Sequence, residues 1–106
     1  MTLKESKLKE IIRTLAADFF SRESNRTSLI TITDVELKSR NANATILFTV
    51  LPVDQEAAAL DFTHRKLGEL REYINDHSRM MRVPFLDVAI DEGEKNRQRI
   101  DVLSNI

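Results

Sequence analysis

The chain has 106 residues and a mass of 12.2 kDa, the size of a single domain with one hydrophobic core. Hydrophobic residues make up 42% and charged residues 31%, as in folded proteins, and the net charge of −1 excludes a domain that is basic over its whole surface. The absence of cysteine excludes disulfide bonds, cysteine-ligated zinc and thiol nucleophiles.

An N-terminal helix is predicted because apolar residues recur at helical spacing between residues 8 and 20. Thr2 and Glu5 have the separation of a capping box, which would satisfy early backbone N–H groups. The polar stretch over residues 21–27 predicts a loop. The expected apolar stripe consists of Leu8, Ile11, Ile12, Leu15, Ala16, Phe19 and Phe20.

Two segments rich in β-branched residues, Leu29–Leu37 and Ala44–Leu51, predict strands. The short polar connection between them favours an antiparallel hairpin. The alternation of the first strand breaks near Thr33 and Asp34. Either a β-bulge or a sheet covered on both faces at one end only would explain the break.

A second helical region is predicted over residues 55–80, with Asp54 as its N-cap. Gly68 interrupts this region and predicts a kink. The residue before Pro84 avoids helical backbone, so the helix must end there and a third strand is expected over residues 85–90. The residues expected to face inward are Ala58, Phe62, Leu67, Leu70 and Ile74, with Tyr73 as a further candidate.

The predicted order is therefore α-β-β-α-kink-α-β, an α+β fold whose three-stranded sheet packs against helices. We expect one domain over residues 1–106, with its core at about 6–91. Residues 92–106 form a charged C-terminal tail, either partly helical or mobile. Its weak helical stripe consists of Ile100, Leu103 and Ile106.

The sequence lacks the patterns of common catalytic and cofactor sites. Gly68 and Gly93 are the only glycines, too few for a phosphate-binding loop or a dinucleotide fingerprint. His64 and His77 lie thirteen residues apart, which is not the spacing of a helical metal pair, so we interpret them as surface residues. We therefore expect no enzyme activity, metal, cofactor or small-molecule substrate.

The same sequence gives no sign of export or membrane insertion. Its first ten residues carry acids early and no apolar run, so no signal peptide is expected. No stretch approaches the roughly 18 apolar residues of a membrane span. We expect a cytoplasmic protein.

Basic side chains concentrate in two parts of the chain. Residues 4–26 and residues 63–82 each carry a net charge of +2, whereas residues 41–62 carry −3 and residues 87–106 carry −2. The second basic part surrounds Gly68, where a helix start would offer free N–H groups to a phosphate.

The alternative is a solvated helix face stabilised by a pair between Arg65 and Glu69. Only Phe62 and Tyr73 are aromatic near this point, so stacking on bases is not expected. Recognition of RNA by its shape and backbone would be the mode.

Several short motifs, in this order, resemble the bacterial ribosome-binding factor A family over residues 6–103. They are TITDVEL at 31–37 with ATI at 44–46, GELR at 68–71, and VPFL at 83–86 followed by Asp91. The resemblance implies a type II K-homology (KH) fold, in which an alanine-x-glycine helical kink replaces the usual GxxG loop.

The sequence departs from the family pattern at a few positions. Lys66 stands where the family has the kink alanine, and Arg40 where an aspartate is common. Met81 stands where the family has an arginine, and the arginine of this sequence, Arg82, comes one position later. Phe85 replaces a usual glutamate.

The resemblance implies a non-catalytic assembly factor that binds the free small (30S) ribosomal subunit and its 16S rRNA. It would assist late maturation and 5′-end processing of the rRNA and growth in the cold, acting as a monomer. Gly68 would set the kink, and Arg71 and Arg79 would contact phosphates. Charge alone adds the other members of the candidate RNA-binding set, which is Arg65, Lys66, Gly68, Arg71, Arg79 and Arg82.

Two alternatives remain open from the sequence. The chain could be a KH-like RNA-binding domain unrelated to ribosomes, although the missing GxxG loop argues against that. It could also be a protein-interaction module that uses a free sheet edge. We expect Arg71→Glu to weaken binding to the small subunit and to leave the thermal midpoint nearly unchanged.

Overall fold

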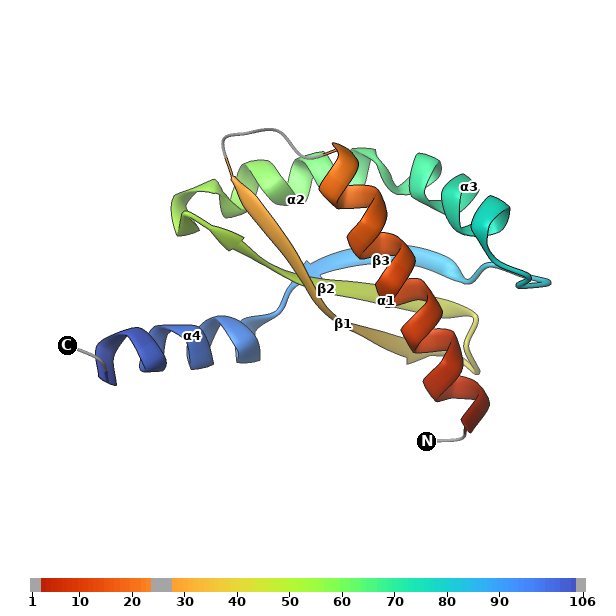
Figure 1. Cartoon of the computed structure of the whole chain (residues 1–106), viewed down its shortest axis with the longest axis horizontal. Coiled ribbons are helices and arrows are strands. Elements are labelled where there is room, and N and C mark those ends of the chain that lie inside the picture. Colours follow the sequence, from red (N-terminus) through yellow and green to blue (C-terminus); the bar gives the residue numbers. More distant parts are fainter. Residues whose placement is uncertain (1–2, 24–27, 105–106) are drawn as a thin grey trace.

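The computed structural model describes the backbone of residues 3–23 and 28–104, and the side chains of residues 4–23 and 28–100. Thr2 of the predicted capping box therefore lies outside the described residues. The predicted element order is confirmed, with one helix added at the C-terminus (Figure 1). The elements are α1 (Leu3–Glu23), β1 (Leu29–Lys38), β2 (Asn43–Leu51), the short 3₁₀ helix η1 (Val53–Gln55), α2 (Glu56–Arg65), α3 (Leu67–His77), β3 (Phe85–Ile90) and α4 (Glu92–Ser104).

The three strands form one mixed sheet in the order β1-β2-β3. Strand β1 pairs antiparallel with β2, with Leu29 opposite Leu51, so the predicted hairpin is confirmed. Strand β3 pairs parallel with β2, with Phe85 opposite Asn43. Because parallel neighbours need a crossover connection, α2 and α3 lie between β2 and β3 in the chain.

The irregular pattern of β1 comes from a β-bulge. The register shifts between Ile32 and Asp34, which leaves Thr33 as the extra residue. Ile32 and Val35 are consequently both buried, although they are three positions apart. Of the two explanations that the sequence allows, the bulge is the one observed.

Helix α1 extends to Glu23, so residues 21–23 are helical rather than part of the predicted loop, whose other residues lie outside the described part of the chain. Six of the seven residues in the predicted apolar stripe are buried or half-buried. The exception is Ile11, which is 41% exposed, so its assignment to the core is wrong.

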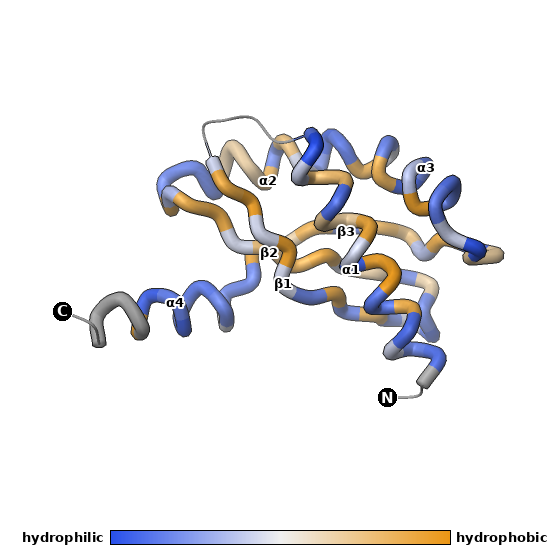
Figure 2. The backbone as a smooth tube through the Cα atoms, viewed as in Figure 1, coloured by the Kyte–Doolittle hydropathy of each residue, from blue (hydrophilic) through white to orange (hydrophobic). Residues whose placement is uncertain are grey.

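The core fills the space between the sheet and helices α1, α2 and α3, and hydrophobic segments face this interior (Figure 2). Leu70 and Ile74 are fully buried as predicted, and Tyr73 is half-buried against α1. Ala58 is exposed and Ala59 is buried in its place, because α2 is rotated by one residue from the predicted pattern.

The predicted long helix is two helices that meet at Lys66. This residue has φ −90° and ψ 0°, and its N–H group is shared between the carbonyls of Phe62 and Thr63. The break therefore precedes Gly68, which lies within α3. Asp54 belongs to η1 rather than capping α2, and α3 ends at His77 rather than near residue 80.

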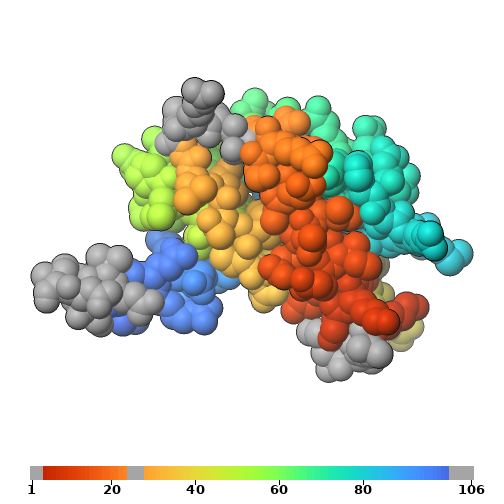
Figure 3. All heavy atoms as spheres, in the orientation of Figure 1, coloured from red at the N-terminus to blue at the C-terminus, as the bar shows by residue number. Residues whose placement is uncertain are grey.

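The charged tail forms helix α4, which projects from the body (Figures 1 and 3). Its first turn is fixed by Asp91, whose carboxylate accepts hydrogen bonds from the Thr33 hydroxyl (2.6 Å) and the Glu94 N–H (3.0 Å). These bonds, that from Thr33 first, lower the pKa of Asp91. The side chain of Ile100 is 60% exposed. The side chains of the other two stripe residues, Leu103 and Ile106, lie outside the described residues.

Candidate nucleic-acid interface

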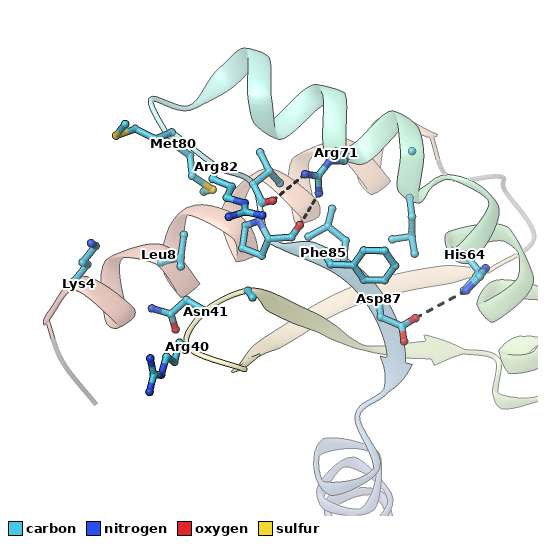
Figure 4. Close-up of a pocket in the computed structure, with 17 residues that line it drawn as sticks. Lys4, Leu8, Arg40, Asn41, His64, Arg71, Met80, Arg82, Phe85 and Asp87 are labelled. Carbon is cyan, nitrogen blue, oxygen red and sulfur yellow. Dashed lines mark hydrogen bonds and ion pairs between the residues drawn. The ribbon is translucent and has the colours of Figure 1, made fainter.

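A groove of about 1030 Å³ runs between helices α2 and α3 and the edge strand β3, and it continues past the hairpin turn to the start of α1 (Figure 4). Its walls come from segments that are far apart in the sequence. Leu67 and Gly68 line it from α3, Phe85 and Asp87 from β3, and Lys4 from α1.

Positive charge is concentrated along this groove. Its lining includes four basic side chains, one lysine and three arginines, and one carboxylate, that of Asp87. Four unit charges against one give the groove a positive potential, although the whole chain is nearly neutral. The cationic lining residues come from four different segments and are Lys4, Arg40, Arg71 and Arg82.

The hairpin turn presents Arg40 at the end of the groove beside Asn41 (Figure 4). Ser39, Arg40 and Asn41 have φ values of 56°, 55° and 68°, in the left-handed region that favours glycine and asparagine. An arginine costs about 1–2 kcal/mol in that conformation. The turn keeps this cation at the groove at the expense of stability.

Arg71 has a structural role that the sequence does not reveal. Its guanidinium donates hydrogen bonds to the carbonyls of Pro84 (Nη1–O 2.7 Å) and Val83 (Nη2–O 2.9 Å). Both carbonyls belong to buried residues that lead into β3. Arg71 therefore joins α3 to this segment, so we now expect Arg71→Glu to lower the thermal midpoint, unlike the expectation from the sequence.

Arg79 and Arg82 lie in the connection between α3 and β3, and both are exposed. Within the described part of the chain, neither has a hydrogen-bonding or ion-pair partner. Arg82 lines the groove, whereas Arg79 lies outside it, next to the lining residue Met80. Both guanidinium groups are available to an external anion.

Lys66 and Arg65 are engaged with carboxylates and do not line the groove. The Lys66 ammonium lies 3.0 Å from Glu69 and 3.4 Å from Glu23, and these contacts, that with Glu69 first, raise the pKa of Lys66. Arg65 pairs with Asp61 at 3.2 Å. The pair between Arg65 and Glu69 that the sequence suggests is not formed.

Gly68 is an exposed residue in the first turn of α3 and lines the groove. Its φ is not positive, and a Cβ added to it would meet no atom within 4 Å. The fold therefore accepts an alanine at this position. The glycine keeps the helix surface open to whatever occupies the groove.

The outer edge of β3 is partly satisfied by its own side chains. The N–H group of Phe85 bonds to Ala42, just before β2, and that of Asp91 bonds to Phe48 in β2. By alternation, the N–H of Val88 points to the free side. The Asp87 carboxylate accepts this N–H at 2.8 Å and also lies 3.9 Å from His64 Nε2. This arrangement covers one of the N–H groups that a strand added at the β3 edge would use.

The structure thus gathers three of the six predicted site residues, Gly68, Arg71 and Arg82, in one groove. Sequence reasoning missed two of its cations, Lys4 and Arg40. Lys4 lies in the N-terminal basic segment, and the local charge of that segment was the only sign in the sequence that Lys4 belongs to the site. The sequence also assigned no role in the site to three exposed residues that line the groove, namely His64, Met81 and Phe85.

Two other kinds of site find no support in the described ranges. Residues 3–23 and 28–104 contain no cluster of three or more histidine, aspartate or glutamate side chains suited to a metal ion. Among the described helices, none combines the length and the apolarity needed to cross a membrane.

The protein is a KH-like α+β domain. It has an interrupted helix pair beside a three-stranded sheet and a cationic groove along the edge strand. The crystal structure of ribosome-binding factor A from Thermus thermophilus is similar, with a TM-score of 0.71 and 19% identity over 80% of this chain and 93% of that one. A Thermotoga maritima protein named as a candidate ribosome binding factor A, solved by NMR, gives a TM-score of 0.67 and 18% identity over 79% and 83%.

The family model for ribosome-binding factor A matches residues 4–104. The chain therefore belongs to the ribosome-binding factor A family, as the motifs in its sequence predict. No curated protein sequence shows a significant match.

Proposed function

We propose that the chain binds the small (30S) ribosomal subunit through 16S rRNA and assists late maturation of the subunit, including 5′-end processing of the rRNA and growth in the cold. It would do so without catalysis, as a cytoplasmic monomer. Membership of the ribosome-binding factor A family supports the ribosomal partner. The observation that carries the RNA contact is the groove in which cations from four separate segments converge.

The charge distribution favours a directed contact with phosphates. The net charge of −1 would disfavour general binding to polyanions, whereas the groove carries four cations to one carboxylate. Arg40, Arg82 and Lys4 have no carboxylate partner among the described residues, so binding phosphate would cost them no existing ion pair. These three side chains are our principal phosphate contacts.

The remaining predicted site residues would contribute in different ways. Arg79 lies next to the groove and would extend the contact along the RNA backbone. Arg65 and Lys66 would have to leave their carboxylate partners, so we expect smaller effects from them. Arg71 would act mainly by holding the wall of the groove in place.

Co-sedimentation with purified small subunits, large subunits and whole ribosomes over a salt series tests the proposal. We expect binding confined to the small subunit, weakening as the salt concentration rises. Arg79→Glu/Arg82→Glu should reduce binding, whereas the matched variant Arg97→Glu/Arg99→Glu, with the same charge change on α4, should not. Failure to bind any particle at low salt would refute the proposal.

The same experiment separates the two alternatives. A domain for unrelated RNA would bind free single strands and ignore ribosomal particles. A module that adds a partner strand to its sheet edge would bind independently of salt. At the β3 edge, the capping of the Val88 N–H by Asp87 argues against such a strand.

A further inference from the structure

We propose that the groove receives an unpaired nucleotide of the RNA and that the base of this nucleotide stacks on the ring of Phe85. The inference rests on the proposed function, because it names the form of RNA that the same groove takes. It also reverses the expectation from the sequence, in which the aromatic residues near the basic segment were too few for stacking.

The exposure of Phe85 is the first observation. This residue is 72% exposed although it begins a strand, and its ring extends into the groove below Arg71 and toward His64 (Figure 4). The exposed ring leaves apolar surface in contact with water, and a base stacked on it would remove that surface from water. An aromatic face within a cationic groove matches a nucleobase, because every base has a π-face and a phosphate attached through its sugar.

The backbone around Phe85 is firmly held. Its N–H donates to the carbonyl of Ala42 at 2.8 Å, and Arg71 holds the two carbonyls that precede it. The ring is therefore presented on a fixed segment, which lowers the entropy lost when a base is bound. The Arg71 hydrogen bonds would therefore favour RNA binding, by fixing the backbone that carries the ring, as well as stabilise the fold.

The space beside the ring is open on the helix side. Gly68 contributes no side chain there, and an added Cβ would meet nothing within 4 Å. Leu67 is an apolar lining residue of the same groove, which the cations Arg82 and Arg40 also line. A base could lie against Phe85 while its flanking phosphates approach these cations.

This arrangement selects unpaired RNA. Away from the ends of a duplex, the bases are stacked inside the helix and present only their edges, so they cannot cover the ring. An apolar peptide would also cover Phe85, but four lysine and arginine side chains against one carboxylate favour a polyanion. We therefore commit to a single-stranded segment of RNA as the occupant.

Fluorescence anisotropy tests the inference with labelled oligouridylate and with an RNA duplex long enough that its terminal base pairs contribute little to binding. Phe85→Ala should weaken binding to oligouridylate by about 5- to 150-fold, the range for losing one stacked base. Binding to the duplex should change less than twofold. Phe85→Tyr retains a ring and should bind like the parent protein.

Urea unfolding of each variant verifies the fold, which Phe85→Ala should leave intact because the side chain is largely exposed. The inference would be overturned if Phe85→Ala and the parent bound oligouridylate with equal affinity. It would also be overturned if Phe85→Ala lost as much affinity for the duplex as for oligouridylate. Parallel sedimentation with small subunits distinguishes the two proposals. If the parent protein binds small subunits but Phe85→Ala binds oligouridylate as tightly as the parent does, only the stacking inference is refuted. If oligouridylate binding depends on the ring but the parent does not bind small subunits, only the ribosomal partner is refuted.

Discussion

Replacing Arg71 with alanine removes both hydrogen bonds from its guanidinium to the carbonyls of Val83 and Pro84. A hydrogen bond that involves a charged group contributes about 1.5–3 kcal/mol, and the exposure of the Arg71 side chain brings each bond to about 1–1.5 kcal/mol, at or below the lower end of that range. We therefore expect Arg71→Ala to lower the free energy of unfolding by about 2–3 kcal/mol. For a domain of about 100 residues, this corresponds to a fall in Tm of roughly 10–15 °C.

Urea unfolding followed by far-UV circular dichroism measures this loss, with Arg82→Ala as the matched control. Arg82 lines the same groove and has no partner among the described side chains, so its removal should change the free energy by less than about 0.5 kcal/mol. The m-value should be unchanged in both variants, because neither alters the surface exposed on unfolding. Equal urea midpoints for the two variants would refute the structural role of Arg71.

Three further predictions concern stability, and two of them concern binding as well. Gly68→Ala should raise the free energy of unfolding by about 0.5–1 kcal/mol, since alanine is the better helix former and its Cβ meets no neighbour. The same variant should weaken small-subunit binding in sedimentation if the open helix surface serves the RNA, and unchanged binding would contradict that use. Asp91→Asn should destabilise the fold and loosen α4. Because the pKa of Asp91 is lowered from 3.8 in the folded state, its stabilisation is complete above that value and is lost as the pH falls through the lowered pKa. The difference in unfolding free energy between parent and Asp91→Asn should therefore shrink below about pH 3.8, and a difference that grows on acidification would contradict the assignment. Arg40→Gly should relieve the strained turn, giving stability at least equal to that of the parent together with weaker RNA binding in anisotropy, and a clear loss of stability would contradict the strain.

The order of elements followed from local patterns in the sequence. Helical spacing, β-branched runs and the position of Pro84 each act within a few residues, and the structure confirms the elements that they predict. The bulge at Thr33 was detectable because it shifts the alternation of apolar residues by one position. The helix break was misplaced by two residues, since a glycine permits a kink without requiring one there.

The site was less predictable because it depends on contacts between distant parts of the chain. The roles of Arg71 and Asp91 come from hydrogen bonds to segments 12–13 and 58 residues away. Lys4 and Arg40 reach the groove only through the packing of α1 and the shape of the hairpin turn. Local charge identified the basic neighbourhood, but it could not tell free cations from those that carboxylates already hold, such as Lys66.

The most direct test of the central claim is site-specific cross-linking within the complex of the chain and the small subunit. A benzophenone side chain at Met81, a fully exposed residue that lines the groove, should cross-link to 16S rRNA. The same group at Val53, which is exposed but does not line the groove, should not. Cross-links to the RNA from Val53 alone, or equally from both positions, would contradict the groove as the surface that contacts the ribosome.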